Sequence, residues 1–454
     1  MRGSARPRLA WYGDDFTGSA AVMEVLAFAG LKAVLLSDVP STALAERFAD
    51  ADALGIASTA RSHGPEWMAA NLPAPLAWLD ATGAEILHYK ICSTFDSSPS
   101  AGNIGRAIEI ALETRASEAV PLVTAAPQMR RYQSFGHLYA GVFEGVFRLD
   151  RHPVMARHPV TPMDEADLLR HLARQTDLPS ALIDLEALWS GSATAALDQA
   201  IANGAKIISL DDMEPASELA VGRLIWENRD RFRLAVGSQG LEYALVRHWR
   251  EIGEIAPAPP SQSAGSVKQI AAISGSVSPS TARQIAWSAA NGFEIIGFDA
   301  ASVVGDACAL EAEITRATRT ALEALSTGAS VLVTSAAGPD DPRVAAFTAA
   351  LSASSLDFET ANARIGKALG RVLDQVLRQS GLCRAVISGG DTSGHGMRAL
   401  GIEALEALAP TVPGAALCLG HSEGPHDGLQ IALKGGQMGS EDFFGWIRDG
   451  GGPR

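Results

Sequence analysis

Two adjacent carboxylates, Asp14 and Asp15, are the first residues along the chain whose types and spacing suit chemistry. They follow the apolar residues 9–12 and stand between Gly13 and Gly18, which would let a ligand approach the backbone closely. A carboxylate at the end of a strand can orient a reacting hydroxyl group and accept its proton. It can equally cap the helix that follows, while its neighbour faces solvent. The pattern by itself leaves both interpretations open.

A second polar segment begins at Lys90, near the end of the apolar residues 85–91. Ser93 and Thr94 follow it, and residues 102–105 (GNIG) are typical of a helix start. A lysine followed by hydroxyl groups in this place suits a carboxylate or phosphate ligand. The alternative is an ordinary serine-rich helix cap beside a solvated lysine.

The second half of the chain holds four glycine- and serine-rich segments, at residues 274–281, 335–339, 388–394 and 434–440. Turns of this composition expose backbone N–H groups and helix N-termini, which together bind the phosphates of a nucleotide. The chain lacks both G-x-x-x-x-G-K-[ST] and a G-x-G-x-x-G after its first strand. Neither a P-loop enzyme nor a dinucleotide-binding fold therefore has direct support.

Metal and disulfide chemistry have little support. His152 and His158 lie in a basic, proline-rich loop, and their spacing is not diagnostic of a metal site. The cysteines form no C-x-x-C pair and lie far apart in the sequence, at Cys92, Cys308, Cys383 and Cys418. This spacing predicts reduced thiols rather than disulfides or a zinc site.

The elements that must position these residues alternate between short apolar runs and longer periodic segments, a pattern typical of β-α-β units. Predicted strands fall in two series, at residues 9–12, 33–36, 53–57 and 85–91, and at residues 269–273, 294–298, 330–334 and 385–388. Residues 255–266, rich in Pro, Ser and Gln, form a linker between them. We expect an α/β protein of two α/β domains with mainly parallel sheets, residues 1–254 and 267–454, and an active site in the interdomain cleft.

Composition narrows the class of protein. The chain has 454 residues, 47% hydrophobic and 19% charged, with a formal net charge of −14. These values exclude a disordered chain, and the acidic balance argues against a nucleic-acid or membrane partner. No apolar stretch approaches the roughly 18 residues of a membrane span, and no signal peptide is evident. We expect a cytoplasmic protein.

These segments together resemble the four-carbon acid sugar kinase family over nearly the whole chain. The resemblance is carried by residues 14–18 (DDFTG), 90–97 (KICSTFDS), 136–138 (GHL), 158–163 (HPVTPM), 274–278 (SGSVS), 389–394 (GGDTSG) and 432–439 (ALKGGQMG). It implies phosphorylation of a small sugar acid, such as an erythronate, a threonate or a 3-oxo-tetronate, by ATP with Mg²⁺. The family also makes a homodimer plausible.

The resemblance implies a role for each domain. The N-terminal domain would hold the sugar acid, with Asp14 or Asp15 as the catalytic carboxylate and with Lys90, Ser93 and Thr94 as further contacts. The C-terminal domain would hold ATP through Ser274, Gly275, Ser276, Ser278, Gly389, Gly390, Asp391, Thr392 and Gly435. No ligand of Mg²⁺ is assigned, and Asp391 is the one candidate.

The sequence departs from the family pattern at several places. Cys92 stands where many relatives have an aspartate, and Cys92 to Asp96 (CSTFD) resembles the 3-oxo-tetronate branch. Residues 132–137 differ from the usual sequence of that branch, and Gly436 and Met438 stand where Ser and Phe are frequent in the family. The substrates to consider therefore include a branched acid such as 3-oxo-isoapionate. Two other classes are an NAD(P)-dependent oxidoreductase and a non-catalytic nucleotide-binding effector.

Overall fold

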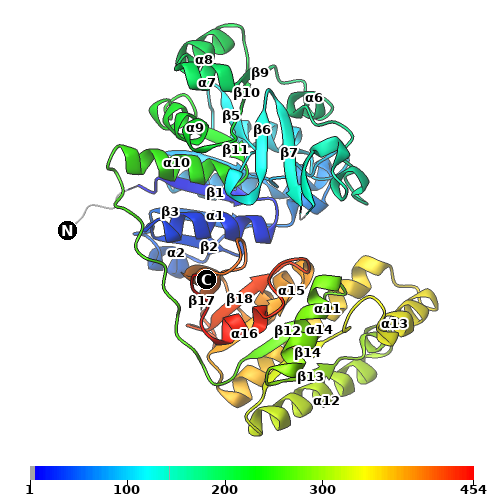
Figure 1. Cartoon of the computed structure of the whole chain (residues 1–454). Coiled ribbons are helices and arrows are strands. Elements are labelled where there is room, and N and C mark those ends of the chain that lie inside the picture. The colour runs from blue at the N-terminus through cyan, green and yellow to red at the C-terminus, as the bar shows by residue number, and fades with distance from the viewer. Residues whose placement is uncertain (1–5, 143) are drawn as a thin grey trace. The chain divides into compact units, whose positions relative to one another are not determined.

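The computed structural model describes residues 6–142 and 144–454, and the chain divides into two compact units. Unit 1 comprises Met1–Pro259 and unit 2 comprises Pro260–Arg454, so the division falls inside the segment 255–266. In Figure 1, unit 1 runs from blue to green and unit 2 from green to red.

Unit 1 is built on a parallel sheet. Its strands lie in the order β2-β3-β1-β4-β11-β5-β10-β9, and their pairings are all parallel. The strands are β1 (Leu9–Gly13), β2 (Ala33–Leu36), β3 (Ala53–Ala57), β4 (Ile86–Lys90), β5 (Val120–Val123), β9 (Ser180–Ile183), β10 (Ile207–Leu210) and β11 (Leu234–Gly237). The central ones are buried along their length, as continuous apolar runs in a parallel sheet require.

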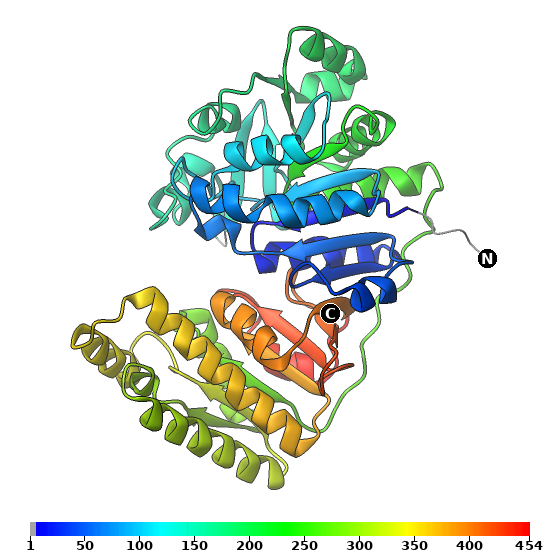
Figure 2. The same ribbon diagram turned by 180° about the vertical axis from the view of Figure 1, so that it is seen from behind.

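Helices cover both faces of this sheet. α1, α9 and α10 pack together on one face in Figure 1, and α3, α4 and α5 cover the other face in Figure 2. The helices of unit 1 are α1 (Phe16–Phe28), α2 (Thr42–Arg47), α3 (Pro65–Asn71), α4 (Pro73–Ala81), α5 (Ile104–Thr114), α6 (Leu168–Leu172), α7 (Leu185–Ser190), α8 (Ala193–Ala202), α9 (Pro215–Glu227) and α10 (Gly240–Glu251), with short 3₁₀ turns at η1 (Ala60–Ser62), η2 (Pro127–Met129), η3 (Leu149–Arg151) and η4 (Met155–Arg157).

The strand order fixes where polar side chains gather. β1 pairs with β3 on one side and with β4 on the other, and Gly13 is in register with both Ala57 and Lys90. The segments that follow these strands therefore leave the sheet side by side. The carboxyl edge of a parallel sheet is where ligands bind in this class of fold.

Unit 1 also carries a small antiparallel sheet that the sequence pattern did not predict. It consists of β6 (Arg131–Ser134), β7 (His137–Val142) and β8 (Gly145–Arg148). The turn between β6 and β7 places Phe135 and Gly136 at φ values of 49° and 78°. Asp211 holds this turn by accepting hydrogen bonds from the N–H groups of both residues, at 2.5 and 3.0 Å.

Unit 2 is built on a mixed sheet in the order β13-β14-β12-β15-β18-β17-β16. β13, β14, β12, β15 and β18 pair in parallel in that order. β17 pairs antiparallel with both β18 and β16. The elements of unit 2 are β12 (Ala271–Ser274), α11 (Pro279–Ala290), β13 (Phe293–Gly297), η5 (Ala300–Val303), α12 (Ala307–Ser326), β14 (Ser330–Thr334), α13 (Pro342–Ser352), α14 (Phe358–Ser380), β15 (Arg384–Ser388), α15 (Gly390–Leu400), β16 (Ala404–Ala409), β17 (Leu417–His421), β18 (Gln430–Lys434) and α16 (Phe443–Arg448).

Two helical layers enclose this sheet. α11 and α16 pack on one face, while α12, α14 and α15 pack on the other (Figures 1 and 2). Phe443 and Phe444 of α16 are fully buried in the core beside Leu332 and Val386 of the sheet.

The α/β class with mainly parallel sheets is confirmed. The antiparallel strands of both units were not predicted. Those of unit 1 are short and half-buried and carry no distinctive apolar run. The location of the active site in a cleft between the domains stays a prediction from the sequence. None of the helices in the described residues is long and apolar enough to cross a membrane.

Candidate functional site

The carboxyl edge of the unit 1 sheet brings Asp14 and Asp15 together with an arginine, Arg61. Arg61 donates hydrogen bonds from Nη2 to Asp14 Oδ1 and to Asp15 Oδ1, each at 2.6 Å, and from Nε to Asp14 Oδ2 at 3.1 Å. Asp15 also caps α1, because its Oδ1 accepts from the N–H of Gly18 at 3.0 Å. The two aspartates therefore share one cation at the point where β1 and β3 end.

Burial separates the two carboxylates. The side chain of Asp14 is 4% exposed and that of Asp15 is 27% exposed. Burial raises the pKa of Asp14, Arg61 opposes that shift, and the neighbouring Asp15 adds to it. Burial also disfavours the charge on Arg61, but the carboxylates of Asp14 and Asp15 outweigh it and raise the pKa of Arg61 well above its ordinary value. The result is a hydrogen-bonded cluster of one arginine and two carboxyl groups, of which Asp15 is the accessible one.

Lys90 adjoins this cluster at the end of β4. Its side chain is nearly fully buried, so the solvated lysine of the alternative interpretation is wrong. Lys90 Nζ donates to the carbonyl of Ile91 at 2.5 Å. A Cβ atom built on Gly18 would lie 2.6 Å from Lys90 Nζ, so the absence of a side chain at position 18 lets the lysine lie against the first turn of α1, close to Asp15.

The residues after Lys90 form a buried, locally bonded turn. Thr94 donates from Oγ1 to Asp96 Oδ1 at 2.7 Å and therefore accepts from the thiol of Cys92, whose Sγ lies 3.0 Å away. Burial raises the pKa of Cys92 and keeps it a thiol. Ser93 is also buried, and Phe95 has a left-handed φ of 57°.

Two arginines of this region were missed from the sequence. Arg61 follows β3 by a few residues, and the rule that ligands gather beyond strand ends could have found it. Arg131, in β6, donates from Nη1 to the carbonyls of Met129 and Gly141 at 3.0 and 3.1 Å, while its buried Nε finds no acceptor among the described residues. Burial lowers the pKa of Arg131, and the carboxylate of Asp96 opposes that shift. No signal in the sequence placed Arg131 near this site.

In unit 2, the four glycine- and serine-rich segments follow four neighbouring strands, β14, β12, β15 and β18. Ser274, Ser388 and Lys434 occupy one row across β12, β15 and β18, so the turns begin side by side. The N–H of Gly275 donates to the carbonyl of Ser388 at 3.0 Å, and the N–H of Gly389 donates to the carbonyl of Lys434 at 2.9 Å.

Side chains of the first turn of α11 hold the segment after β18. Ser278 caps α11, accepting from the N–H of Thr281 at 3.1 Å, and it also hydrogen bonds to the carbonyl of Gly436. Thr281 Oγ1 lies 2.9 Å from the same carbonyl. A Cβ atom on Gly436 would lie 2.4 Å from Ser276 Oγ, so a side chain there would force Ser276 to move.

The turn after β15 leads into α15. Gly389 has a φ of 121°, a conformation that favours glycine, and a Cβ atom there would lie 2.9 Å from Thr392 Oγ1. Gly390 begins α15, and a Cβ atom on it would meet open space. The side chain of Asp391 lies outside the described part of the structure. The structure thus gathers Ser276, Ser278, Gly389 and Gly390 at one sheet edge, with Gly435 next to Lys434.

This edge of unit 2 fits a polyphosphate. α15 presents its N-terminus beside an unobstructed glycine, and Ser388 Oγ is buried without a hydrogen-bond partner among the described residues. Among those same residues, no group of three or more His, Cys, Asp or Glu side chains could hold a metal ion.

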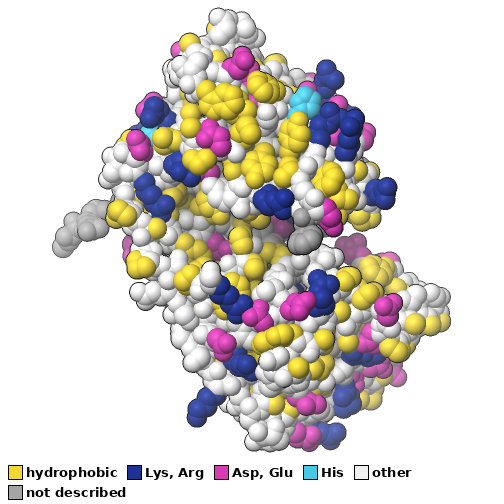
Figure 3. Space-filling model, in the orientation of Figure 1, with side chains coloured by type: hydrophobic (Ala, Val, Ile, Leu, Met, Phe, Trp, Pro, Cys, Tyr) yellow, Lys and Arg dark blue, Asp and Glu magenta, His cyan; other side chains and the backbone are white. Residues whose placement is uncertain are grey.

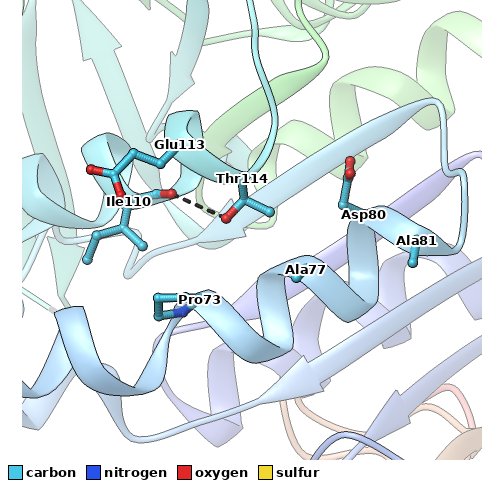
Figure 4. A pocket seen from close by; sticks show the side chains of 7 residues that line it. All are labelled: Pro73, Ala77, Asp80, Ala81, Ile110, Glu113 and Thr114. Carbon is cyan, nitrogen blue, oxygen red and sulfur yellow. Dashed lines mark hydrogen bonds between the residues drawn. The ribbon is translucent and has the colours of Figure 1, made fainter.

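A separate groove of 410 Å³ lies between α4 and α5. Figure 4 shows Pro73, Ala77, Asp80 and Ala81 of α4 facing Ile110, Glu113 and Thr114 of α5, with the Thr114 hydroxyl bonded to the Ile110 carbonyl at 3.3 Å. None of the predicted site residues lines it. On the face shown in Figure 3, basic and acidic side chains lie interspersed over each unit.

Two family models match the chain. A model described as a sugar-binding N-terminal domain matches residues 9–245, and one described as a nucleotide-binding C-terminal domain matches residues 271–444. The chain belongs to the four-carbon acid sugar kinase family. The family expected from the motifs is thereby confirmed, and with it an enzyme of the carbohydrate kinase class that uses ATP.

Curated relatives cover nearly the whole chain. A 3-oxo-isoapionate kinase of Paraburkholderia graminis is 45% identical over 97% of this chain and 94% of its own length. A 3-oxo-tetronate kinase of Pseudomonas fluorescens is 31% identical over 97% of this chain and 96% of its own.

Solved structures share the fold. A crystal structure from Salmonella typhimurium, provisionally named a tRNA synthase, superposes with a TM-score of 0.78 at 25% identity and covers 97% of this chain and 98% of its own. A Haemophilus influenzae protein from a domain family of unknown function superposes with a TM-score of 0.74 at 21% identity, covering 97% of this chain and 99% of its own.

Proposed function

We propose that this enzyme transfers the γ-phosphoryl group of ATP to a hydroxyl group of 3-oxo-isoapionate or a closely similar branched sugar acid. The observation that supports this most is the cluster in which Arg61 holds Asp14 and Asp15 beside the buried Lys90. A carboxylate and two cations in one place suit an acid whose hydroxyl group must be deprotonated and whose own carboxylate must be neutralised.

Asp15 is the catalytic base in this proposal. Both oxygens of Asp14 accept hydrogen bonds from Arg61 and its side chain is only 4% exposed, so this carboxyl group is poorly accessible to a substrate. Asp15 uses only Oδ1, toward Arg61 and Gly18, and its Oδ2 has no hydrogen bond among the described residues. Asp15 is also the more exposed of the two. It can therefore accept the proton of the hydroxyl group, while Asp14 positions Arg61.

The cations bind the negative charges of the reaction. Lys90 lies against the first turn of α1 and pairs with the substrate carboxylate or the migrating phosphoryl group. Arg61 has a fixed orientation because two carboxylates hold it. Ser93 and Thr94 line the same segment and contact sugar oxygens. Catalysis of phosphoryl transfer consists largely of such positioning and charge neutralisation.

Unit 2 holds ATP through the turns after β12, β15 and β18. Main-chain N–H groups near Gly389, Gly390 and Gly435 bind phosphate oxygens, and the hydroxyl groups of Ser274, Ser276, Ser278 and Thr392 stand beside them. Mg²⁺, when bound to the ATP phosphates, supplies charge neutralisation.

The choice of substrate follows the relatives. The 3-oxo-isoapionate kinase shares 45% identity with this chain and the 3-oxo-tetronate kinase shares 31%, both over nearly full length. A branched acid also agrees with the departures of residues 132–137 from the tetronate branch. A cytoplasmic location and a homodimer stay predictions.

The test is turnover. Purified protein is incubated with ATP, Mg²⁺ and a panel containing 3-oxo-isoapionate, 3-oxo-tetronates, threonates and erythronates, and ADP release is measured. We expect the highest kcat/KM with the branched acid. Absence of both turnover and ATP binding would reject the proposal. ATP binding without turnover on any acid would favour an effector, and a shift of nicotinamide fluorescence on titration would favour an oxidoreductase.

A further inference from the structure

Lys434 is a buried cation that the proposed mechanism does not use. It is the last residue of β18, and only 1% of it is exposed. Its register partner Ser388 ends β15, directly before the Gly389 turn. Lys434 therefore lies at the base of the glycine-rich edge, between the turns that follow three strands.

Its ammonium group joins two of those turns. Lys434 Nζ lies 3.3 Å from Thr281 Oγ1 in the first turn of α11 and 3.3 Å from the carbonyl of Gly435. Thr281 in turn lies 2.9 Å from the carbonyl of Gly436. The lysine thus fixes the orientation of the Gly435 peptide and, through Thr281, that of the next one.

No acidic side chain among the described residues neutralises this ammonium group. The elements around it contribute the hydroxyl group of Thr281 and the rings of Phe443 and Phe444, each centred 6.0 Å from Nζ. Asp442, at the start of α16, is bonded instead to Ser440 and Arg454. Burial alone lowers the pKa of Lys434 to about 8. A buried cation without an acidic partner destabilises a fold, so its presence points to an anionic ligand.

We infer that Lys434 is a phosphate-binding and positioning residue of unit 2, which attracts the β- and γ-phosphates of ATP and orients the Gly435–Gly436 peptides toward them. This inference rests on the proposed nucleotide site. Because the charge of a nucleotide grows with each phosphate, the contribution of Lys434 grows in the order AMP, ADP, ATP. A residue that only stabilised the turn would affect all three nucleotides equally.

The first test compares affinities by calorimetry, with ATP, ADP and AMP as probes and no sugar acid present. Lys434→Gln removes the charge and keeps a hydrogen-bonding group, and Lys434→Met removes both. We expect each to weaken ATP binding about tenfold to a hundredfold, ADP less, and AMP by less than about twofold. Lys367→Gln, at an exposed site on α14, is the charge-matched control and should change none of them.

The second test uses pH. Between pH 7.5 and 9.5 the free ammonium group of Lys434 loses its proton, and a bound polyphosphate favours the charged form, so the wild-type affinity for ATP should fall as the pH rises. The affinity of Lys434→Gln should be nearly independent of pH over this range.

Each outcome is decisive. If wild-type protein binds no ATP, the proposed function fails and this inference fails with it. If wild type binds ATP but the variants bind all three nucleotides with equal loss or none, the proposed function stands and the inference is overturned. A wild-type affinity independent of pH would overturn it as well, even if Lys434→Met did not fold.

Discussion

Replacing Arg61 with glutamine removes the cation that faces the buried carboxylate of Asp14. Arg61 makes two hydrogen bonds to that carboxylate, at 2.6 and 3.1 Å, and the Asp14 side chain is only 4% exposed. Glutamine has no charge and cannot present the same fork of donors. The variant is therefore left with a desolvated carboxyl group that has lost its cation and lies beside a second carboxylate, Asp15.

The magnitude follows from this burial. Removing one partner of a buried ion pair destabilises a protein by about 3–5 kcal/mol, because the remaining charge is uncompensated. Arg174 offers a matched control in the same unit: it pairs with Asp164 at 2.6 Å, but the two side chains are 47% and 67% exposed. Loss of an exposed pair costs about 0–1 kcal/mol. We expect Arg61→Gln to reduce the free energy of unfolding by several times the effect of Arg174→Gln.

The loss of unfolding free energy in Arg61→Gln should also depend on pH. In wild type, Arg61 counteracts the rise that burial and Asp15 impose on the pKa of Asp14. Without Arg61 this pKa rises further above its unfolded value of about 4, so between the two values the folded protein binds a proton that the unfolded chain does not. Lowering the pH then favours folding of the variant. Relative to wild type, its deficit should shrink by up to about 1.4 kcal/mol per pH unit as the pH falls below the raised value.

The assay is urea unfolding followed by tryptophan fluorescence at pH 5.5, 6.5 and 7.5, with hydrogen exchange of the β1 peptide assigning the transition to unit 1. The double variant Asp14→Asn/Arg61→Gln carries no charge at either position and should therefore be more stable than Arg61→Gln alone. A deficit below about 1 kcal/mol at pH 7.5, or one that does not change with pH, would refute the reasoning.

Three further predictions concern the two sheet edges. Asp15→Asn keeps a good helix cap, so its thermal midpoint should stay near wild type while kcat falls at least about a hundredfold in the ADP-release assay; an active variant would contradict its role as the base. Gly18→Ala should raise KM for the sugar acid but not for ATP, because the added Cβ would lie 2.4 Å from Asp15 Oδ1 and 2.6 Å from Lys90 Nζ, and equal effects on both KM values would contradict this. Gly389→Ala forces a side chain into a φ of 121° and should weaken ATP binding and lower stability by about 1–3 kcal/mol, whereas Gly390→Ala, which meets open space, should leave stability nearly unchanged in the same urea titration.

Sequence reasoning was most successful in locating the ends of the buried strands. Asp14, Lys90 and the Gly389 turn each come at the end of a run of buried apolar residues. Such runs can be recognised in the sequence without knowledge of the tertiary contacts. The family motifs add the class of enzyme, because they combine these strand ends in a fixed order. The hairpins from β6 to β8 were missed, since their strands are short and half-buried and their turn depends on Asp211, far along the chain.

What the sequence by itself determined is the set of strand ends, their polar residues and the α/β class, all of which depend on local periodicity. Only the tertiary structure decided which of these charged residues pair with one another and which lack a partner of opposite charge. Arg61 reaches Asp14 because β3 lies beside β1, and Lys434 is left without an acidic partner among the described residues because of what surrounds β18. Strand order and burial arise from packing between distant segments, and the free energy of a charge depends on that packing more than on its neighbours in sequence.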